Sequence, residues 1–255
     1  MAFIWGGTFI AGRILVQSLS PFTAAFWRYA IASLCLLVLT VKLEGRLPKL
    51  RRQDVLPVIV LGLSGIFAYN AFFFSGLQTV SASRASLIVA ANPTAIAFTA
   101  ALLLKEKLTP LKLSGVVAAL MGAIVVISQG RPLALLTQGV STGDLYLLGC
   151  VLSWTIYTLV GRHVVETISP FAATTYACLV GTPILLLPAL QEGVLQSWRM
   201  FSPLSWLGVL YLALLGTVVA FCWYYEGVKK IGAPSAAVFI NLVPVTAVFL
   251  AALIL

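Results

Sequence analysis

One segment of this sequence occurs twice. Residues 3–22, FIWGGTFIAGRILVQSLSPF, return in outline as residues 152–171, LSWTIYTLVGRHVVETISPF. Six positions match at a single offset of 149 residues, including Trp5 with Trp154, Arg13 with Arg162, and the Ser-Pro-Phe triplets that close both segments. A fixed offset over several uncommon residue types indicates an internal repeat, and a repeat constrains the arrangement of the whole chain.

The composition places the repeat in a membrane. Of 255 residues, 61% are hydrophobic and 9% are charged, whereas a soluble domain carries about 25% charged residues. Apolar runs of about 20 residues, the length that crosses a hydrocarbon core, recur throughout. Runs such as VVAALMGAIVVIS do not alternate, which disfavours a β-barrel. We predict an all-α integral membrane protein with spans near 2–18, 22–41, 55–77, 84–104, 111–129, 143–161, 170–190, 204–227 and 233–255.

The 16 Lys and Arg residues concentrate in alternate links between the spans. The links after the second, fourth, sixth and eighth spans hold eleven of them: Lys42, Arg46, Lys49, Arg51, Arg52, Lys105, Lys107, Lys112, Arg162, Lys229 and Lys230. The opposite links hold four: Arg13, Arg84, Arg131 and Arg199. By the positive-inside rule, the even links and the N-terminus face the cytoplasm. The net charge of +9 therefore reports orientation, and no aromatic-basic patch suggests nucleic acid as a partner.

The orientation makes the repeats antiparallel. Span one runs outward and its copy, span six, runs inward. A second register supports the repeat, because Gly76 matches Gly227 and Pro93 matches Pro244, each pair 151 residues apart. Inverted-topology repeats are a common construction of secondary transporters, with the substrate held between the halves. We predict a first repeat over 1–129, a connecting loop over 130–142 and a second repeat over 143–255.

Five motifs together resemble the EamA-type exporters of the drug/metabolite transporter superfamily: WGGTF at 5–9, SPFTAAFWRYAIA at 20–32, ANPTAIAFTAALLLKEKLT at 91–109, LKLSGVVAALMGAIVVIS at 111–128 and NLVPVTAVFLAAL at 241–253. The resemblance implies two inverted repeats of five helices and export of metabolites. About nine helices are expected. The offsets place the last residue opposite Leu104 and Met1 opposite Cys150, so against the family pattern the tenth helix is missing and the first lacks about two turns. A natural nine-helix protein is the alternative.

Polar and aromatic side chains in mid-span are candidates for substrate binding, because a polar group in hydrocarbon is costly unless it faces a cavity or the bundle interior. The resemblance places the helices that carry them around a central cavity. Trp and Tyr also form interfacial belts, and Asn also links neighbouring helices, so both roles stay open. At Pro93 and Pro244 a broken helix could free carbonyl groups toward the cavity. The candidates are Trp5, Thr8, Tyr69, Asn70, Phe73, Asn92, Trp154, Tyr157, Trp223 and Asn241.

Few charged residues fall within the spans. Arg28 lies about two turns into span two, where it either extends to the outer headgroups, the alternative we favour slightly, or takes part in coupling or gating. Glu226 either pairs with Lys230 at i,i+4 or couples protons to transport. His163, the one histidine, falls in a cytoplasmic link where a surface role is expected.

These features predict a transporter and disfavour an enzyme. The seven acids lie nearly all in loops, and no paired Asp, Ser–His pair or HExxH helix is present. We expect alternating-access export of small organic metabolites, amino acids or similar amphipathic compounds, from a bacterial inner membrane. The alternative is a structural or lipid-scrambling membrane protein. We expect membrane lipid and a small-molecule substrate as partners, with no metal or other cofactor, and leave a homodimer open.

Overall fold

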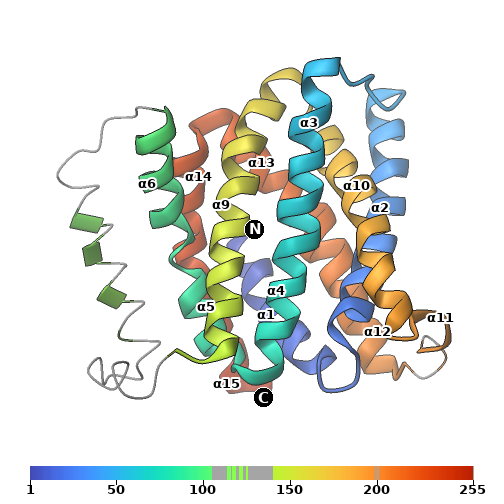
Figure 1. Ribbon diagram of the computed structural model, residues 1–255, viewed down its shortest axis with the longest axis vertical. Coiled ribbons are helices and arrows are strands. Elements are labelled where there is room, and N and C mark those ends of the chain that lie inside the picture. Colours follow the sequence, from blue (N-terminus) through green and yellow to red (C-terminus); the bar gives the residue numbers. More distant parts are fainter. Residues whose placement is uncertain are drawn as a thin grey trace.

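The computed structural model describes residues 1–104, 140–197, 199 and 201–254, with isolated residues between 114 and 125. Every regular element in these ranges is helical, and Figure 1 shows the longer helices side by side. Within these ranges, seven helical stretches are long and apolar enough to cross a membrane: Pro21–Glu44, Arg52–Thr79, Ala82–Leu103, Thr142–Thr167, Pro170–Gln191, Pro203–Ile231 and Ala233–Leu253. A shorter apolar helix covers Ala2–Leu15. The prediction of an all-α integral membrane protein is confirmed. The predicted span 111–129 lies outside the described residues, apart from isolated positions.

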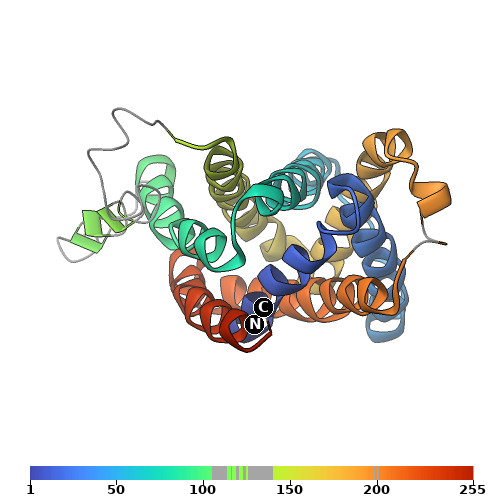
Figure 2. The ribbon, with the colours of Figure 1, turned by 90° about the horizontal axis from the view of Figure 1, so that it is seen from below.

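Several spans consist of more than one helical segment. Two segments, η1 and η4, are π-helical, and η5 is a 3₁₀ turn. The elements are α1 (Ala2–Leu15), α2 (Pro21–Glu44), α3 (Arg52–Leu61), η1 (Gly62–Ala68), α4 (Tyr69–Thr79), α5 (Ala82–Val89), α6 (Asn92–Leu104), α9 (Thr142–Thr167), α10 (Pro170–Gln191), α11 (Val194–Ser197), α12 (Pro203–Leu210), η4 (Tyr211–Val219), α13 (Ala220–Ile231), α14 (Ala233–Val238), η5 (Phe239–Leu242) and α15 (Val243–Ile254). Viewed end on in Figure 2, most of these helices run close to a common direction.

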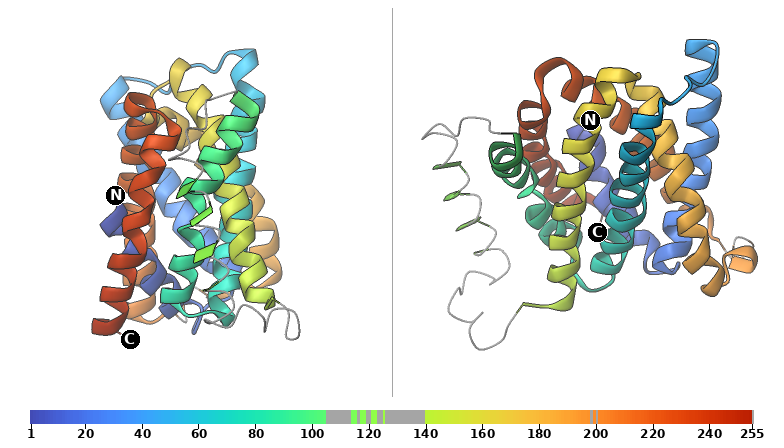
Figure 3. Two further views of the ribbon diagram at one scale, coloured as in Figure 1. Left: turned by 90° about the vertical axis from the view of Figure 1, so that its left-hand side faces the viewer. Right: turned by 45° about the horizontal axis from the view of Figure 1, so that its top comes forward.

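The helix breaks expected at the two repeat-related prolines are present. The span Ala82–Leu103 divides into α5 and α6 just before Pro93. The span Ala233–Leu253 divides into α14 and α15 around the 3₁₀ turn η5, which ends just before Pro244. Proline has no amide hydrogen, and it disfavours helical geometry in the residue that precedes it. Figure 3 shows these spans from two further directions. The breaks place the ends of short helices inside the bundle.

The two π-helical segments are related by the repeat. Gly65 in η1 and Gly216 in η4 are 151 residues apart, and each leaves room for a side chain of the other half. A Cβ on Gly65 would lie 2.1 Å from the Tyr157 ring, and one on Gly216 would lie 2.8 Å from Thr8 Cγ2. Thr8 and Tyr157 are themselves 149 residues apart. Each half therefore places one side chain against a glycine of the other half, at repeat-related positions.

Helices α2 and α10, which are equivalent in the repeat, pack antiparallel. Glu192, just after α10, accepts hydrogen bonds from the amides of Phe22 and Thr23 at the start of α2, at 3.3 and 2.7 Å. At the other end, Ser169 Oγ at the start of α10 donates to Glu44 Oε1, which ends α2. Each helix thus has a carboxylate from its partner near its N-terminus, where anions are favourable.

Equivalent residues meet midway along this helix pair. Ser33 Oγ and Thr182 Oγ1, which are 149 residues apart, share a hydrogen bond of 2.9 Å. A contact between equivalent positions lies on the axis that relates the two halves. Together with the antiparallel packing of α2 and α10, it shows the inverted relation that the offsets predict. The repeat boundaries at 129 and 143 stay predictions.

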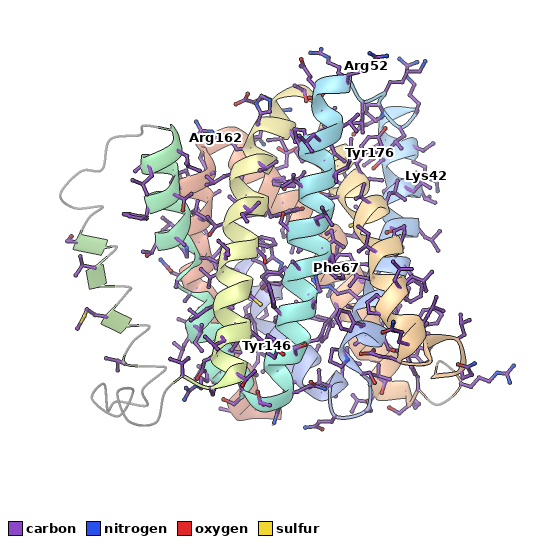
Figure 4. All side chains as sticks on the ribbon, viewed as in Figure 1. Lys42, Arg52, Phe67, Tyr146, Arg162 and Tyr176 are labelled. Atoms are coloured by element: carbon purple, nitrogen blue, oxygen red, sulfur yellow. The ribbon has the colours of Figure 1, made fainter. Side chains whose placement is uncertain are left out.

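The even links and the odd links lie at opposite ends of the bundle. Figure 4 shows Arg52 and Arg162 at one end and Tyr146 near the other. At the Tyr146 end, the guanidinium of Arg84 binds the buried carboxylate of Asp144 through two hydrogen bonds of 3.0 and 2.8 Å. The assignment of the Arg52 end to the cytoplasm stays a prediction of the positive-inside rule.

Candidate functional site

The centre of the bundle is an aromatic cluster built by both halves. The rings of Trp5 on α1 and Trp154 on α9 meet edge to face, with centroids 5.3 Å apart and an interplanar angle of 87°. Tyr224 on α13 lies 5.4 Å from each of them. Edge-to-face geometry is favourable because the positive ring edge faces the negative ring face. The two tryptophans that the sequence repeats are therefore in contact.

A cavity opens beside this cluster. The space in it that is open to the centre of a water molecule is about 30 Å³. Seven predicted residues line it, namely Trp5, Thr8, Arg28, Tyr69, Phe73, Asn92 and Trp154, together with Phe9, Val89, Phe221, Ile240 and Val243. Most of this wall is aromatic or aliphatic, which suits a ligand with an apolar body.

Helix breaks and π-helical segments position the polar groups of the wall. The Trp5 indole N–H donates to the carbonyl of Gly216 in η4 at 3.1 Å, and Thr8 Oγ1 donates to the Trp5 carbonyl at 2.7 Å. Asn92 begins α6 at the break before Pro93, and its buried Oδ1 has no hydrogen-bond partner within the described part of the chain. A free amide oxygen in the wall can accept a hydrogen bond from a ligand.

Asn70 and Tyr157, also predicted as substrate-binding, stand behind the wall. Asn70 Nδ2 donates to the carbonyls of Gly65 and Ile66 at 3.3 and 2.8 Å and to the Tyr29 hydroxyl at 3.0 Å. The Tyr157 ring packs against Trp154, with centroids 5.0 Å apart. Neither Asn70 nor Tyr157 lines the cavity. They support residues that do.

The structure corrects the position of Arg28. Its side chain is 3% exposed, lines the cavity, and donates from Nε to Thr217 Oγ1 at 3.0 Å and from Nη1 to Asn70 Oδ1 at 3.1 Å. The expectation that it extends to the outer headgroups is wrong, because these two acceptors lie inside the bundle. The interfacial-belt alternative is likewise wrong for Trp5, which is buried in the central cluster with Tyr224.

Two predicted residues lie away from this cavity. Trp223 is 58% exposed, because the inward face of α13 carries Phe221, Tyr224 and Tyr225. Asn241 is exposed, because it falls in the 3₁₀ turn η5 and Ile240 beside it is the buried residue of that turn. Neither residue lines this cavity, and a role of either in substrate binding stays a prediction. Sequence reasoning missed the apolar lining, which has no polar signal.

The remaining charged candidates are near the ends of helices. Lys230 Nζ lies 3.5 Å from Glu226 Oε2, so the predicted i,i+4 ion pair is confirmed. A role of Glu226 in proton coupling stays a prediction. His163 Nδ1 lies 3.7 Å from the Glu166 carboxylate at an exposed site. Within the described residues, no group of three or more His, Cys, Asp or Glu side chains is placed to hold a metal ion.

Comparison with known proteins connects this site to a family. The model of the EamA-like transporter family matches residues 1–128 and 141–255. The chain belongs to the EamA-like transporter family. The protein with this cavity is therefore a membrane transporter.

The relatives of this EamA-like transporter include bacterial and archaeal proteins. It is 32% identical over 240 residues to the uncharacterized transporter YyaM of Bacillus subtilis, covering 94% of this chain and 79% of that one. It is 31% identical over 247 residues to an uncharacterized transporter of Archaeoglobus fulgidus, covering 96% and 84%. It is 28% identical over 228 residues to an S-adenosylmethionine/S-adenosylhomocysteine transporter of Chlamydia trachomatis, covering 86% and 67%.

A solved crystal structure shares the fold of this EamA-like transporter. The superposition has a TM-score of 0.69 and covers 99% of this chain and 85% of the other, at 21% sequence identity. At that identity, the likeness concerns the fold alone.

Proposed function

We propose that this EamA-like transporter moves small organic metabolites, amino acids or similarly amphipathic compounds, out of the cytoplasm across a bacterial inner membrane. The observation that carries the proposal is the aromatic-walled cavity beside the Trp5–Trp154 contact, where the two halves meet. Aromatic rings supply contact area and stacking, and a few polar groups fix orientation.

The inverted relation of the halves supports alternating access. In a protein built from inverted repeats, exchanging the conformations of the two halves converts an inward-open state into an outward-open one. The contacts at Gly65 and Gly216 are related in this way, because Tyr157 approaches one and Thr8 the other. The outward direction of net transport rests on the resemblance to exporters. The Chlamydia trachomatis relative is named as a transporter of S-adenosylmethionine and S-adenosylhomocysteine, which supports a small organic metabolite as substrate.

Counterflow into proteoliposomes tests the proposal. Vesicles containing the purified protein are loaded with one unlabelled amino acid or nucleoside at a time, and uptake of its labelled form is followed with and without a pH gradient. We expect accumulation of a subset of compounds above protein-free vesicles. The Glu226→Gln variant tests coupling, because loss of the carboxylate should remove any dependence on the pH gradient.

The alternative is that this is a structural or lipid-scrambling protein, and the same vesicles distinguish that function from transport. Scrambling exposes fluorescent lipid of the inner leaflet to a membrane-impermeant quencher, whereas a metabolite transporter leaves that lipid protected. Quenching of the inner leaflet without flux of any tested solute would overturn the proposed function. We also propose that the chain divides into two repeats at residues 129 and 143, and recovery of the separately expressed halves tests this division. Cross-linking in membranes tests whether the protein forms a homodimer.

A further inference from the structure

Arg28 is a buried cation whose bonded partners are neutral. Its Nε donates to Thr217 and its Nη1 to Asn70, and its guanidinium carbon lies 5.0 Å from the centroid of the Tyr29 ring. A guanidinium keeps its charge in proteins, so burial cannot be relieved by loss of a proton. A buried charge is costly unless it is paired, and these partners supply dipoles rather than an opposite charge.

The acids of the described chain are engaged elsewhere. Asp144 pairs with Arg84, and Glu226 pairs with Lys230. Glu44 and Glu192 lie at the helix ends of the α2–α10 pair, Asp54 accepts from Thr167 Oγ1 at 3.3 Å, and Glu166 is near His163. None of these carboxylates forms an ion pair with Arg28. The counter-charge for Arg28 is therefore missing from the part of the protein that the structure describes.

The partners of Arg28 hold the guanidinium in place. Thr217 Oγ1 donates to the carbonyl of Leu212 at 3.0 Å, and Asn70 Nδ2 donates to carbonyls of η1. Thr217 and Asn70 thus donate to carbonyls of the π-helical segments η4 and η1, and the side-chain oxygen of each accepts from Arg28. These contacts fix Nε and Nη1, whereas Nη2 has no hydrogen-bond partner within the described residues and belongs to a side chain that lines the cavity.

The repeat itself does not require this polar group. The position equivalent to Arg28 is Ala177, and the position equivalent to Asn70 is Phe221. Contacts that build the architecture, such as Trp5 with Trp154 and Ser33 with Thr182, occur between equivalent positions. The charge at Arg28 breaks that symmetry on the cavity wall, where it can also face a ligand.

We propose that the substrate of this transporter is an organic acid or amino acid with one carboxylate, which binds Arg28, and with an apolar or aromatic body that lies against the Trp5 and Trp154 rings. This inference rests on the proposed function and narrows its substrate class. One carboxylate neutralises one guanidinium and accepts its free N–H donors, with charge-assisted hydrogen bonds about twice as strong as neutral ones. Where the substrate is an amino acid, the free Asn92 Oδ1 can accept from its ammonium group.

Matched carboxylates and amides test this inference on the purified chain. Dissociation constants are measured by thermal-stability titration for 3-phenylpropanoate and L-phenylalanine, and for the primary amide of each. We expect the wild type to bind each carboxylate at least about tenfold more tightly than its amide, since the amide keeps the apolar body and loses the charge. Sodium chloride at the same concentrations is the control anion. An equal response to chloride, or no preference for carboxylates, overturns the proposal.

Variants of Arg28 assign the preference to this residue. Arg28→Gln should reduce the carboxylate preference to about twofold or less, because a neutral amide cannot pair with the anion. Arg28→Lys should give an intermediate value, because an ammonium lacks the planar fork. Lys42→Gln removes a charge from the same helix at an exposed position and should leave the preference unchanged. If Arg28→Gln is not recovered folded, Arg28→Lys decides, and an unchanged preference overturns the proposal.

Transport in proteoliposomes separates this inference from the proposed function. Carboxylate binding that depends on Arg28 without counterflow of any compound would support the substrate class and overturn transport. Counterflow of the amides as fast as the carboxylates would support transport and overturn the substrate class. Counterflow of the carboxylates alone supports both.

Discussion

At the scale of the residue, the site depends on which side of a helix a ring or a polar group faces. Trp154 and Trp223 are both tryptophans in spans of the second half, yet one is buried in the central cluster and the other is 58% exposed. Tyr224, the neighbour of Trp223, contacts Trp5 and Trp154 and shares a hydrogen bond of 2.9 Å with Thr158 Oγ1. A shift of one residue along α13 separates the two environments.

Trp154→Ala should weaken substrate binding by on the order of 1 kcal/mol or more, about fivefold in Kd, because it removes a large stacking surface from the cavity. Trp154→Phe should be milder. Trp223→Ala is the matched control and should leave Kd unchanged, since its ring lies outside this cavity. The measurement is Kd for a transported compound at equal expression. Equal losses in the Trp154→Ala and Trp223→Ala variants would contradict the cavity assignment.

Thr217→Val should lower thermal stability, because the isosteric change removes the acceptor of Arg28 Nε and the side-chain donor to the Leu212 carbonyl. Loss of a hydrogen bond with a buried partner costs about 1–3 kcal/mol. Thr155→Val is the control, since Thr155 Oγ1 donates only to the carbonyl one turn before it. The melting temperature in detergent should fall more for Thr217→Val. An equal change in the two variants would show that the Arg28 contact adds nothing.

At the scale of the element, the two π-helical segments depart from regular α-helix, and both carry close packing between the halves. A π turn interrupts the spacing of 3.6 residues, so the inward face before it does not continue in register after it. Gly65 and Gly216 lie in these segments and admit Tyr157 and Thr8. The wide turns thereby bring the halves within van der Waals distance.

Gly65→Ala should be strongly destabilising, because its Cβ would lie 2.1 Å from a ring atom of Tyr157, which is fully buried. Overpacking of this kind costs about 1–3 kcal/mol or more. Gly227→Ala is the control, since its Cβ would make only an ordinary contact of 3.5 Å with Ala236. The readout is the fraction of monodisperse protein after heating in detergent. Recovery of Gly65→Ala at the level of Gly227→Ala would refute the packing described for η1.

The helix pattern and the pairing of Trp5 with Trp154 could be predicted from the sequence, because apolar run length and a fixed offset are local, countable signals. The contact of Arg28 with Thr217 could not, since 189 residues separate them and the π segment alters the register in between. The same loss of register explains Trp223, since a single period across the whole span does not identify the inward face of α13. The exposed position of Asn241 could not be predicted either, because the sequence gives no signal for the 3₁₀ turn beyond Pro244.

At the scale of the whole molecule, orientation follows from the basic links. The link between α2 and α3 carries Lys49, which is exposed, and Gln78 is exposed at the far end of the next span. By the positive-inside rule, the first of these ends faces the cytoplasm.

A cysteine in place of Lys49 should react with a membrane-impermeant maleimide only in inside-out vesicles, and one in place of Gln78 only in intact cells. The four native cysteines are replaced by alanine in both variants, so that the introduced thiol alone reports. The opposite pattern would reverse the predicted orientation. Labelling of both positions from one side would contradict the spanning of the membrane by Arg52–Thr79.

The unequal pair Arg28 and Ala177 has a consequence for ancestry. Two identical chains assembled around a two-fold axis can place charges at the centre only in pairs, so an arginine at this position would bring a second guanidinium with it. Joining the halves into one polypeptide removes that restriction, since each copy then mutates alone. A single positive charge in the middle of the molecule is therefore something that a fused gene can encode and a symmetric homodimer of half-length chains cannot.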